Sequence, residues 1–299
     1  MMKTIIPSPV RIWLRTRIRQ AALNGANLPL TAVKYVPYKC DTSSYFIPKK
    51  PGNTQEVCKR GLPIPPKELW LGYGTTKEEY LTSGEVHVHN MFEAVTASGF
   101  SLKSRDRILD FGCGSGRMIR HLKRQSESCE IWGTDINANF VYWCQQYLEP
   151  PFHFVTTTTV PHLPFEDGYF DFVYAGSVFT HIDDLADAWL LELRRVLSRE
   201  GRLYLTIHDN HTMELLETIY SHTWLSKVIS SDVSYNASRG SAGKIVLGRD
   251  ADSLVFYDID YFKNMLNSKF DVISVTPEAY DYQTGVLLKH RSKSLNSKD

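Results

Sequence analysis

A glycine-rich turn between a predicted strand and a predicted helix is the segment best suited to bind a ligand. In residues 108–117, ILDFGCGSGR, the glycines at 112, 114 and 116 let the backbone bend tightly and approach a ligand where a β-carbon would collide. Unpaired N–H groups at the start of the following helix favour a carboxylate or phosphate. Asp135, 21 residues after Gly114 and at the end of the next strand, can accept both hydroxyls of a ribose. These features predict a nucleoside-bearing cofactor.

The spacing of the glycines and the acid ahead of them argue against a dinucleotide. The third glycine follows the second by two residues, whereas the dinucleotide fingerprint G-x-G-x-x-G requires three. Asp110 would repel a pyrophosphate and suits a cationic ligand instead. A nucleotide-dependent oxidoreductase is therefore disfavoured.

The elements that must position these residues alternate between short apolar strands and helices. Strands are predicted at 107–112, 130–135, 153–158, 170–176 and 201–208, with helices at 116–125, 137–148 and 184–199 between them. Residues 75–99 are predicted to be helical, with Gly84 separating two helices. A helix at 259–269 precedes strands at 270–280 and 283–291, whose short connector implies an antiparallel pair. The pattern predicts an α/β domain with a mainly parallel sheet.

Three regions lie outside this regular alternation. We divide the chain into a basic N-terminal extension at 1–66, a main domain at 67–290 and a loose tail at 291–299. Within the main domain, residues 209–258 break the alternation and predict a small β-rich insertion after the fifth strand, which could cover a bound acceptor as a lid.

The charge of the chain is unevenly distributed. The net charge is +1 over 299 residues, but residues 1–60 hold eleven Lys or Arg and two acidic residues, a local charge of +9. Residues 11–23 could form a basic amphipathic helix, for which packing on the main domain is favoured over peripheral membrane contact. We expect no nucleic-acid partner, because no RNA-binding signature or zinc finger is present.

The cellular compartment is predicted from what the sequence lacks. No run approaches the roughly 18 apolar residues that cross a bilayer, and the N-terminus is interrupted by prolines and arginines where a signal peptide would be apolar. The five cysteines contain no C-x-x-C pair, as expected for reduced thiols. A cytoplasmic location is predicted.

The chain resembles the class I S-adenosylmethionine-dependent methyltransferases. The resemblance lies in LDFGCGSGR at 109–117, in Asp135, in LPFEDGYFDFVYAGSVFTHI at 163–182 and in LLELRRVLSREGRLYLT at 190–206, and it covers roughly residues 70–290. It implies a Rossmann-like, seven-stranded, mainly parallel sheet with an antiparallel last strand and helices on both faces.

The resemblance also implies where S-adenosylmethionine binds. The residues expected around its methionine moiety are Asp110, Gly112, Cys113, Gly114 and Gly116, with Ala175, Gly176 and Ser177 lining the same part through backbone atoms. Asp135 is expected on the ribose, Ile136 beside the adenine, and Thr159 or a main-chain group where many relatives place an acid for the adenine amino group. Arg117 and Arg120 could hold the helix, reach a carboxylate or form surface ion pairs.

A hydroxyl acceptor needs a general base or a metal to take its proton. His181 follows the fourth strand, while His208 and His211 follow the fifth strand at the same carboxyl edge of the sheet, and each is a candidate base. His208-x-x-His211 could also bind a divalent ion, but such residues are more often ordinary loop residues. We therefore predict no metal site.

The resemblance leads to a prediction of methyl transfer from S-adenosylmethionine to a hydroxyl of a small metabolite or sugar, with a small-molecule or glycan acceptor. Residues 175–178 read AGSV in place of the Asn/Asp-Pro-Pro-Tyr/Phe motif, which disfavours the methylation of a nucleobase or amide nitrogen by that motif. Two alternatives remain. The chain could be a non-catalytic cofactor-binding module that docks a partner through its basic arm, or it could methylate an amine or a carboxylate.

Overall fold

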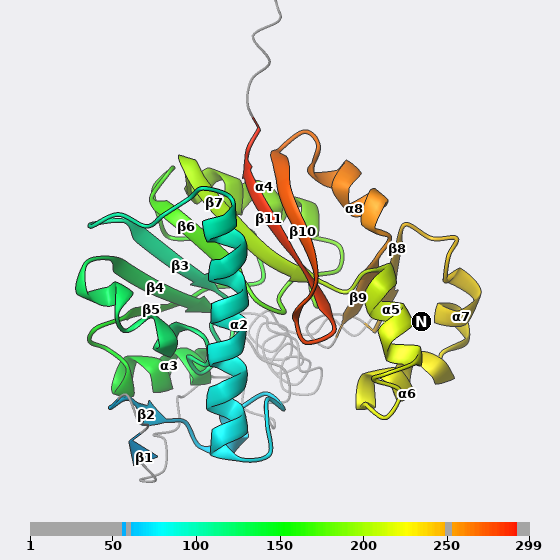
Figure 1. Ribbon diagram of the computed structural model, residues 1–299, viewed down its shortest axis with the longest axis horizontal. Helices are drawn as coiled ribbons and strands as arrows, with labels where there is room; N and C mark the ends of the chain where they lie inside the picture. The colour runs from blue at the N-terminus through cyan, green and yellow to red at the C-terminus, as the bar shows by residue number, and fades with distance from the viewer. Residues whose placement is uncertain (1–55, 58–60, 249–252, 292–299) are drawn as a thin grey trace, which may run out of the picture.

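A seven-stranded sheet forms the centre of the computed structural model, which describes residues 56–57, 61–248 and 253–291 (Figure 1). The strand order is β10-β11-β7-β6-β3-β4-β5. The strands are β3 (Arg107–Phe111), β4 (Glu130–Asp135), β5 (His153–Thr156), β6 (Phe170–Ala175), β7 (Leu197–Ile207), β10 (Phe270–Tyr280) and β11 (Gln283–His290). Strand β11 is antiparallel to both of its neighbours, and the other strands run in one direction. The predicted fold class is confirmed.

Helices cover both faces of the sheet because successive strand residues point to opposite faces. Ile108 packs with residues of α2 (Lys77–Ala97) and α3 (Ala138–Tyr147). Leu109 packs on the other face with residues of α4 (Ala186–Val196) and α8 (Ile259–Leu266). Figure 1 shows α2 as a long helix that crosses in front of the sheet.

Helix α2 is continuous, so the prediction of two helices separated at Gly84 is wrong. Thr76 begins the helix with a capping box in which its side chain accepts from the Glu79 N–H. Gly84 is buried in the middle of α2, and a β-carbon there would lie 2.4 Å from the carbonyl oxygen of Arg117. Gly84 therefore allows α2 to pack directly on the backbone that follows the glycine turn.

The helix predicted at 116–125 is also absent. Turns and two short 3₁₀ helices, η2 (Ile119–Leu122) and η3 (Gln125–Glu127), occupy this stretch. Arg117 and Arg120 are both buried, and Arg120 donates to the carbonyls of Leu62 and Pro63. Surface ion pairs, one of the three roles considered for these arginines, are thereby excluded. These tertiary contacts override the local helix propensity.

Among the described residues of the insertion at 209–258, more lie in helices than in strands, so the prediction of a β-rich segment is wrong. The insertion contains α5 (Asn210–Glu217), α6 (Trp224–Ser231), α7 (Val233–Ser238) and one two-stranded antiparallel sheet of β8 (Lys244–Leu247) and β9 (Leu254–Tyr257). The side chains of Asp209, Thr223 and Asp232 cap the N-termini of the three helices. These caps are a sequence signal for helix starts.

The described part of the N-terminal extension is short. Strands β1 (Glu56–Val57) and β2 (Pro63–Ile64) pair, and a 3₁₀ helix, η1 (Lys67–Leu69), follows. The basic segment at 11–23 and the tail from 292 lie outside the described residues, so their predicted roles stay predictions. Within the described ranges, no helix is long and apolar enough to cross a membrane.

The Gly84 contact yields a stability prediction. Replacing glycine by alanine inside a helix normally stabilises it by about 1 kcal/mol. Gly84→Ala should instead lower the free energy of unfolding by about 1–3 kcal/mol, because the added methyl group would overlap the Arg117 carbonyl. Urea unfolding measures this change. Thr82→Ala, at an exposed position of the same helix, is the matched control and should not destabilise. A Gly84→Ala protein as stable as the wild type would contradict the packing.

Candidate active site

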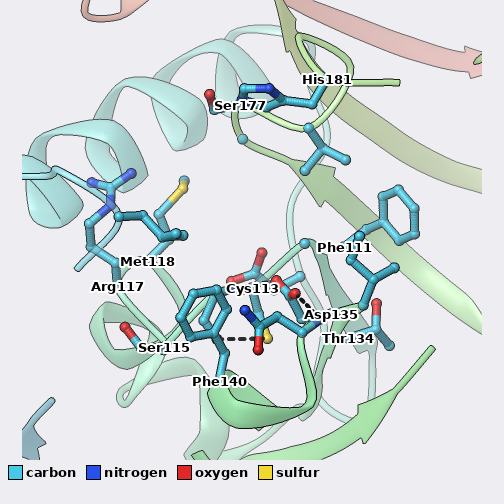
Figure 2. A pocket seen from close by; sticks show the side chains of 18 of the residues that line it. Phe111, Cys113, Ser115, Arg117, Met118, Thr134, Asp135, Phe140, Ser177 and His181 are labelled. Atoms are coloured by element: carbon cyan, nitrogen blue, oxygen red, sulfur yellow. Dashed lines mark hydrogen bonds between the residues drawn. The ribbon is translucent and has the colours of Figure 1, made fainter. Parts of the chain in front are cut away.

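A cavity of about 630 Å³ opens at the carboxyl ends of β3, β4 and β6, where open α/β sheets bind ligands. Ten residues predicted from the sequence line it: Asp110, Gly112, Cys113, Gly114, Asp135, Ile136, Thr159, Gly176, Ser177 and His181. Gly116, Ala175, His208 and His211 are not among its lining residues. Figure 2 shows Asp135 and Cys113 close together, with Ser177 and His181 at the opposite end of the view.

The glycine turn is tightly packed against the ends of neighbouring elements. The N–H groups of Gly112 and Cys113 both donate to the Thr134 carbonyl of β4, at 2.8 and 2.9 Å. Gly112 has φ +82°, and a β-carbon there would lie 2.4 Å from Val178. Gly116, behind the cavity wall, has φ +80° and no room for a β-carbon beside Leu148. Two of the predicted glycines are thus required by conformation and by space.

Asp135 is locked in place by the backbone on both sides of it. Its Oδ2 accepts from the N–H of Gly114 at 2.8 Å, and its Oδ1 accepts from the N–H of Asn137 at 2.7 Å. Burial raises the pKa of Asp135 to about 6, although these two hydrogen bonds oppose the increase. Each carboxylate oxygen retains a second lone pair that can accept a ligand hydroxyl.

Asp110 is a more deeply buried carboxylate with capacity to bind a cation. Only 2% of the residue surface is exposed, and the Tyr174 hydroxyl lies close enough to lower the pKa of Asp110, although Oδ2 makes no hydrogen bond of normal geometry among the described residues. Burial raises the pKa of Asp110 to about 7, and the nearby negative charge of Asp135 adds to the increase. A cationic group bound in the cavity would lower the pKa of Asp110 again and so stabilise its charged form.

Ser177 holds an unusual backbone conformation at the cavity wall. Its φ of +58° lies in the left-handed region, which is strained for a residue with a β-carbon. Its N–H donates to the Thr206 hydroxyl at 2.7 Å, Thr206 donates to Gln283, and Gln283 returns a hydrogen bond to the Ser177 hydroxyl. This closed triangle from β6, β7 and β11 fixes the residue that follows the fourth strand of the sequence prediction.

The structure separates the three candidate histidines. His181 lines the cavity, and its Nδ1 lies 2.8 Å from the Ser253 carbonyl oxygen. His208 is buried against Phe256, and burial lowers its pKa to about 3. His211 pairs with Glu278 at 3.1 Å. His181 is therefore the one of these three that faces the cavity.

A metal site has no support in the part of the chain that the structure describes. No group of three or more His, Cys, Asp or Glu side chains that could hold a metal ion occurs there.

Several cavity residues have no signal in the local sequence. These are Leu69, Trp70, Leu71, Tyr73, Tyr80 and Tyr280, which come from before α2, from α2 itself and from the end of β10. The hydroxyl groups of Tyr73 and Tyr280 meet although the residues are 207 positions apart. Only the fold could bring them together.

Fold and site together define a class of protein. The structure has the glycine turn after the first strand, the acid at the end of the second strand and the antiparallel last strand that the resemblance to class I methyltransferases predicts. A family model described as a methyltransferase domain matches residues 109–205. Residues 109–205 thus match a methyltransferase domain, in agreement with the predicted resemblance.

The curated relatives are quinone methyltransferases by name. A 2-phytyl-1,4-naphtoquinone methyltransferase of Trichormus variabilis is 30% identical over 130 residues, covering 42% of this chain and 55% of the relative. A ubiquinone/menaquinone biosynthesis C-methyltransferase of Paraburkholderia phymatum is 31% identical over 120 residues, covering 39% and 49%. The chain thus spans about half the length of the curated relatives it matches.

Solved structures support the fold. The PH0226 protein of Pyrococcus horikoshii has a TM-score of 0.50 at 19% identity, covering 72% of this chain and 96% of that one. A putative methyltransferase of Haloferax volcanii, in complex with the Trm112 methyltransferase activator, has a TM-score of 0.50 at 16% identity, covering 72% and 95%. At these identities the similarity concerns the fold alone.

The burial of the Asp135 carboxylate can be tested through stability. Because burial raises the pKa of Asp135 to about 6, the folded protein favours the protonated form, and the free energy of unfolding should fall as the pH rises through this pKa. Asp135→Asn cannot ionise and should remove this part of the pH dependence. Urea unfolding at about pH 4 and about pH 7.5 measures the difference, and Glu166→Gln, at an exposed position, is the control. An unchanged pH dependence in Asp135→Asn would contradict the burial of the carboxylate.

Proposed function

We propose that this protein transfers the methyl group of S-adenosylmethionine to a small hydroxylated acceptor. The observation that carries the proposal is one cavity that combines the glycine turn, the fixed carboxylate of Asp135 and the unpartnered Oδ2 of Asp110. A nucleoside with a cationic amino-acid end satisfies all three features at once. A pyrophosphate would meet two carboxylates instead.

The residues of the cavity fit the parts of S-adenosylmethionine. Asp135 would hold the ribose hydroxyls, while Ile136, Phe140 and Thr159 would surround the adenine. Asp110, which lines the same cavity, would lie near the α-ammonium group. When bound, S-adenosylmethionine supplies an electrophilic methyl group on a positively charged sulfur. The chain contributes alignment and the exclusion of water, since apolar side chains such as Leu71 and Phe111 share the lining.

His181 is proposed as the general base. The Ser253 carbonyl can only accept a hydrogen bond, so Nδ1 of His181 carries the hydrogen and Nε2 is the basic nitrogen. Nε2 would take the proton that the acceptor hydroxyl loses as its oxygen gains the methyl group. An amine or carboxylate acceptor would need no such base. Mutation of His181 would therefore slow methylation of a hydroxyl but not methylation of an amine or a carboxylate.

Methylation of a ring carbon is a second candidate reaction, favoured by the names of the quinone C-methyltransferase relatives. Removal of the proton from an aromatic hydroxyl makes both the oxygen and the adjacent ring carbon nucleophilic. The same base at His181 would take the hydroxyl proton in either reaction, and after methylation at carbon the methylated carbon would lose its hydrogen as a proton to water so that the ring becomes aromatic again. These relatives give support to a small-molecule acceptor and none to a sugar or glycan.

Cofactor binding should depend on pH in a defined direction. Bound S-adenosylhomocysteine, the demethylated product, keeps the ammonium group and should lower the raised pKa values of Asp110 and Asp135, which are about 7 and about 6 in the free protein. The affinity for S-adenosylhomocysteine should be highest above pH 7 and should fall as the pH drops from 7 to 5. A protonated carboxyl group cannot form an ion pair with the ammonium group, and it accepts hydrogen bonds from the ribose hydroxyls less strongly. Calorimetry across this range measures the trend. NAD is the control ligand, and NAD binding in place of S-adenosylhomocysteine would overturn the proposal.

The base can be tested by single-turnover kinetics. With labelled methyl donor and a panel of phenols and reduced quinones, His181→Gln should lower the rate of methyl transfer by about 10²- to 10⁴-fold without changing the affinity for S-adenosylhomocysteine. His89→Gln, at an exposed position of α2, should behave as the wild type. An unchanged rate in His181→Gln would exclude it as the base. Cofactor binding with no transfer to any acceptor of the panel would favour the non-catalytic alternative.

A further inference from the structure

The hydrogen bonds between Thr206, Gln283 and Ser177 run in one direction. Thr206 is fully buried, and its Oγ1 already accepts from the Ser177 N–H at 2.7 Å. The hydrogen of the Thr206 hydroxyl therefore needs an acceptor, and Oε1 of Gln283 lies 2.6 Å away. The opposite orientation of the Gln283 amide would place its nitrogen there and leave the Thr206 hydrogen buried without an acceptor, which is costly. Nε2 of Gln283 consequently donates to the Ser177 hydroxyl at 2.8 Å.

Thr180 supplies a second donor to the same hydroxyl. Thr180 is fully buried, and among the described residues its hydroxyl has Ser177 as its one hydrogen-bond partner, with the two oxygens 3.3 Å apart. If Ser177 donated in this contact, the hydrogen of Thr180 would have no acceptor. Thr180 therefore donates, and the Ser177 oxygen accepts from both Gln283 and Thr180.

The Ser177 hydroxyl is left with one unused hydrogen. A hydroxyl has two lone pairs and one hydrogen, and Gln283 and Thr180 occupy both lone pairs of Ser177. Ser177 lines the cavity, so an oxygen of a bound ligand can accept this hydrogen. The backbone of Ser177 keeps a strained φ of +58°, a conformation that persists where the surrounding contacts hold it and that is common at functional sites.

This donor lies in the same turn as the proposed base. Ser177 and His181 both line the cavity, and the His181 N–H donates to the Val178 carbonyl at 2.9 Å. Figure 2 shows Ser177 and His181 close together at one end of the view, well apart from Asp135 and Phe140. Since the nucleoside is proposed to lie at Asp135, the Ser177 hydrogen faces the part of the cavity that is left for the acceptor.

We propose that the Ser177 hydroxyl donates a hydrogen bond to a second oxygen of the methyl acceptor. Gln283, Thr206 and Thr180 are positioning residues that direct its hydrogen into the cavity. A donor to the reacting oxygen would make that oxygen less nucleophilic, so the second oxygen is the better partner. The acceptor is then a hydroxylated ring compound that carries an ether, carbonyl or hydroxyl oxygen besides the hydroxyl that His181 deprotonates. The inference rests on the proposed function and narrows its substrate class.

The test compares ligands that differ in that oxygen alone. The ortho, meta and para isomers of methoxyphenol have the shape of the corresponding ethylphenols, with an ether oxygen in place of a methylene group. Calorimetry measures their binding to the S-adenosylhomocysteine complexes of the full-length wild type, Ser177→Ala, Ser177→Gly and Gln283→Met. Glycine adopts a positive φ without strain, so Ser177→Gly removes the hydroxyl and keeps the turn.

Thr284→Val is the matched control for these variants. Thr284 is a fully buried neighbour of Gln283 on β11, and its hydroxyl has no hydrogen-bond partner among the described residues. Thermal unfolding of each variant reports any general loss of structure.

The wild type should bind at least one methoxyphenol about 3- to 10-fold more tightly than the matching ethylphenol, the effect of one neutral hydrogen bond. Both Ser177 variants should remove this preference and change the affinity for S-adenosylhomocysteine by less than about twofold. Gln283→Met should reduce the preference, because the Ser177 hydrogen can then rotate away from the cavity. Thr284→Val should keep it.

Four results would count against these assignments. A wild type without the preference, or a preference that survives in either Ser177 variant, would overturn the proposal. Loss of S-adenosylhomocysteine affinity in both Ser177 variants would also overturn it, because the hydroxyl would then bind the cofactor. An unchanged preference in Gln283→Met would exclude Gln283 as a positioning residue. A wild type that does not bind S-adenosylhomocysteine would instead overturn the proposed function.

Discussion

Three charged side chains buried at one edge of the sheet constrain the rest of the structure. Asp110 and Asp135 stand at the ends of β3 and β4, and Arg117 follows the glycine turn between them. Burial raises the pKa of both carboxyl groups, so a cation close to them would stabilise their charged forms. A fold keeps such groups only where neighbouring elements hold them rigidly.

Helix α2 provides much of this rigidity. Gly84 brings α2 against the Arg117 carbonyl, Tyr80 contacts the Ser115 hydroxyl at 3.1 Å, and Ser115 donates to the Leu69 carbonyl at 2.6 Å. One helix thus connects the glycine turn to the 69–73 segment, which lines the cavity from the other side. The shape of the cavity and the position of the Arg117 charge therefore depend on one packing contact, that of Gly84 in α2 with the Arg117 backbone.

Local signals explain what the sequence could predict. The strands, the glycine turn and Asp135 are short-range features, because a strand, a turn and the acid at a strand end are each contiguous in the chain. Tyr73 and Tyr280 lie 207 residues apart and meet only because β11 places the end of β10 beside the cavity. The prediction that Gly84 separates two helices is wrong for the same reason, since Gly84 is needed for a contact with the backbone of Arg117 and does not end its own helix. The helices of the insertion begin at capping residues that the sequence shows, namely Asp209, Thr223 and Asp232. The spacing of apolar residues that would mark a helix is weak between them, because the segment is polar and irregular.

The insertion affects the cavity through one loop. None of residues 209–258 lines the cavity described above, so the predicted lid stays a prediction. The insertion does hold the loop that follows β6: Val255 donates its N–H to the Thr180 carbonyl at 2.9 Å, and Lys244 donates to the Asp183 carbonyl at 2.8 Å. The Ser253 carbonyl also sets the ring orientation of His181. Changes in the insertion can therefore alter the orientation of His181, the base proposed above, without any contact with the cavity.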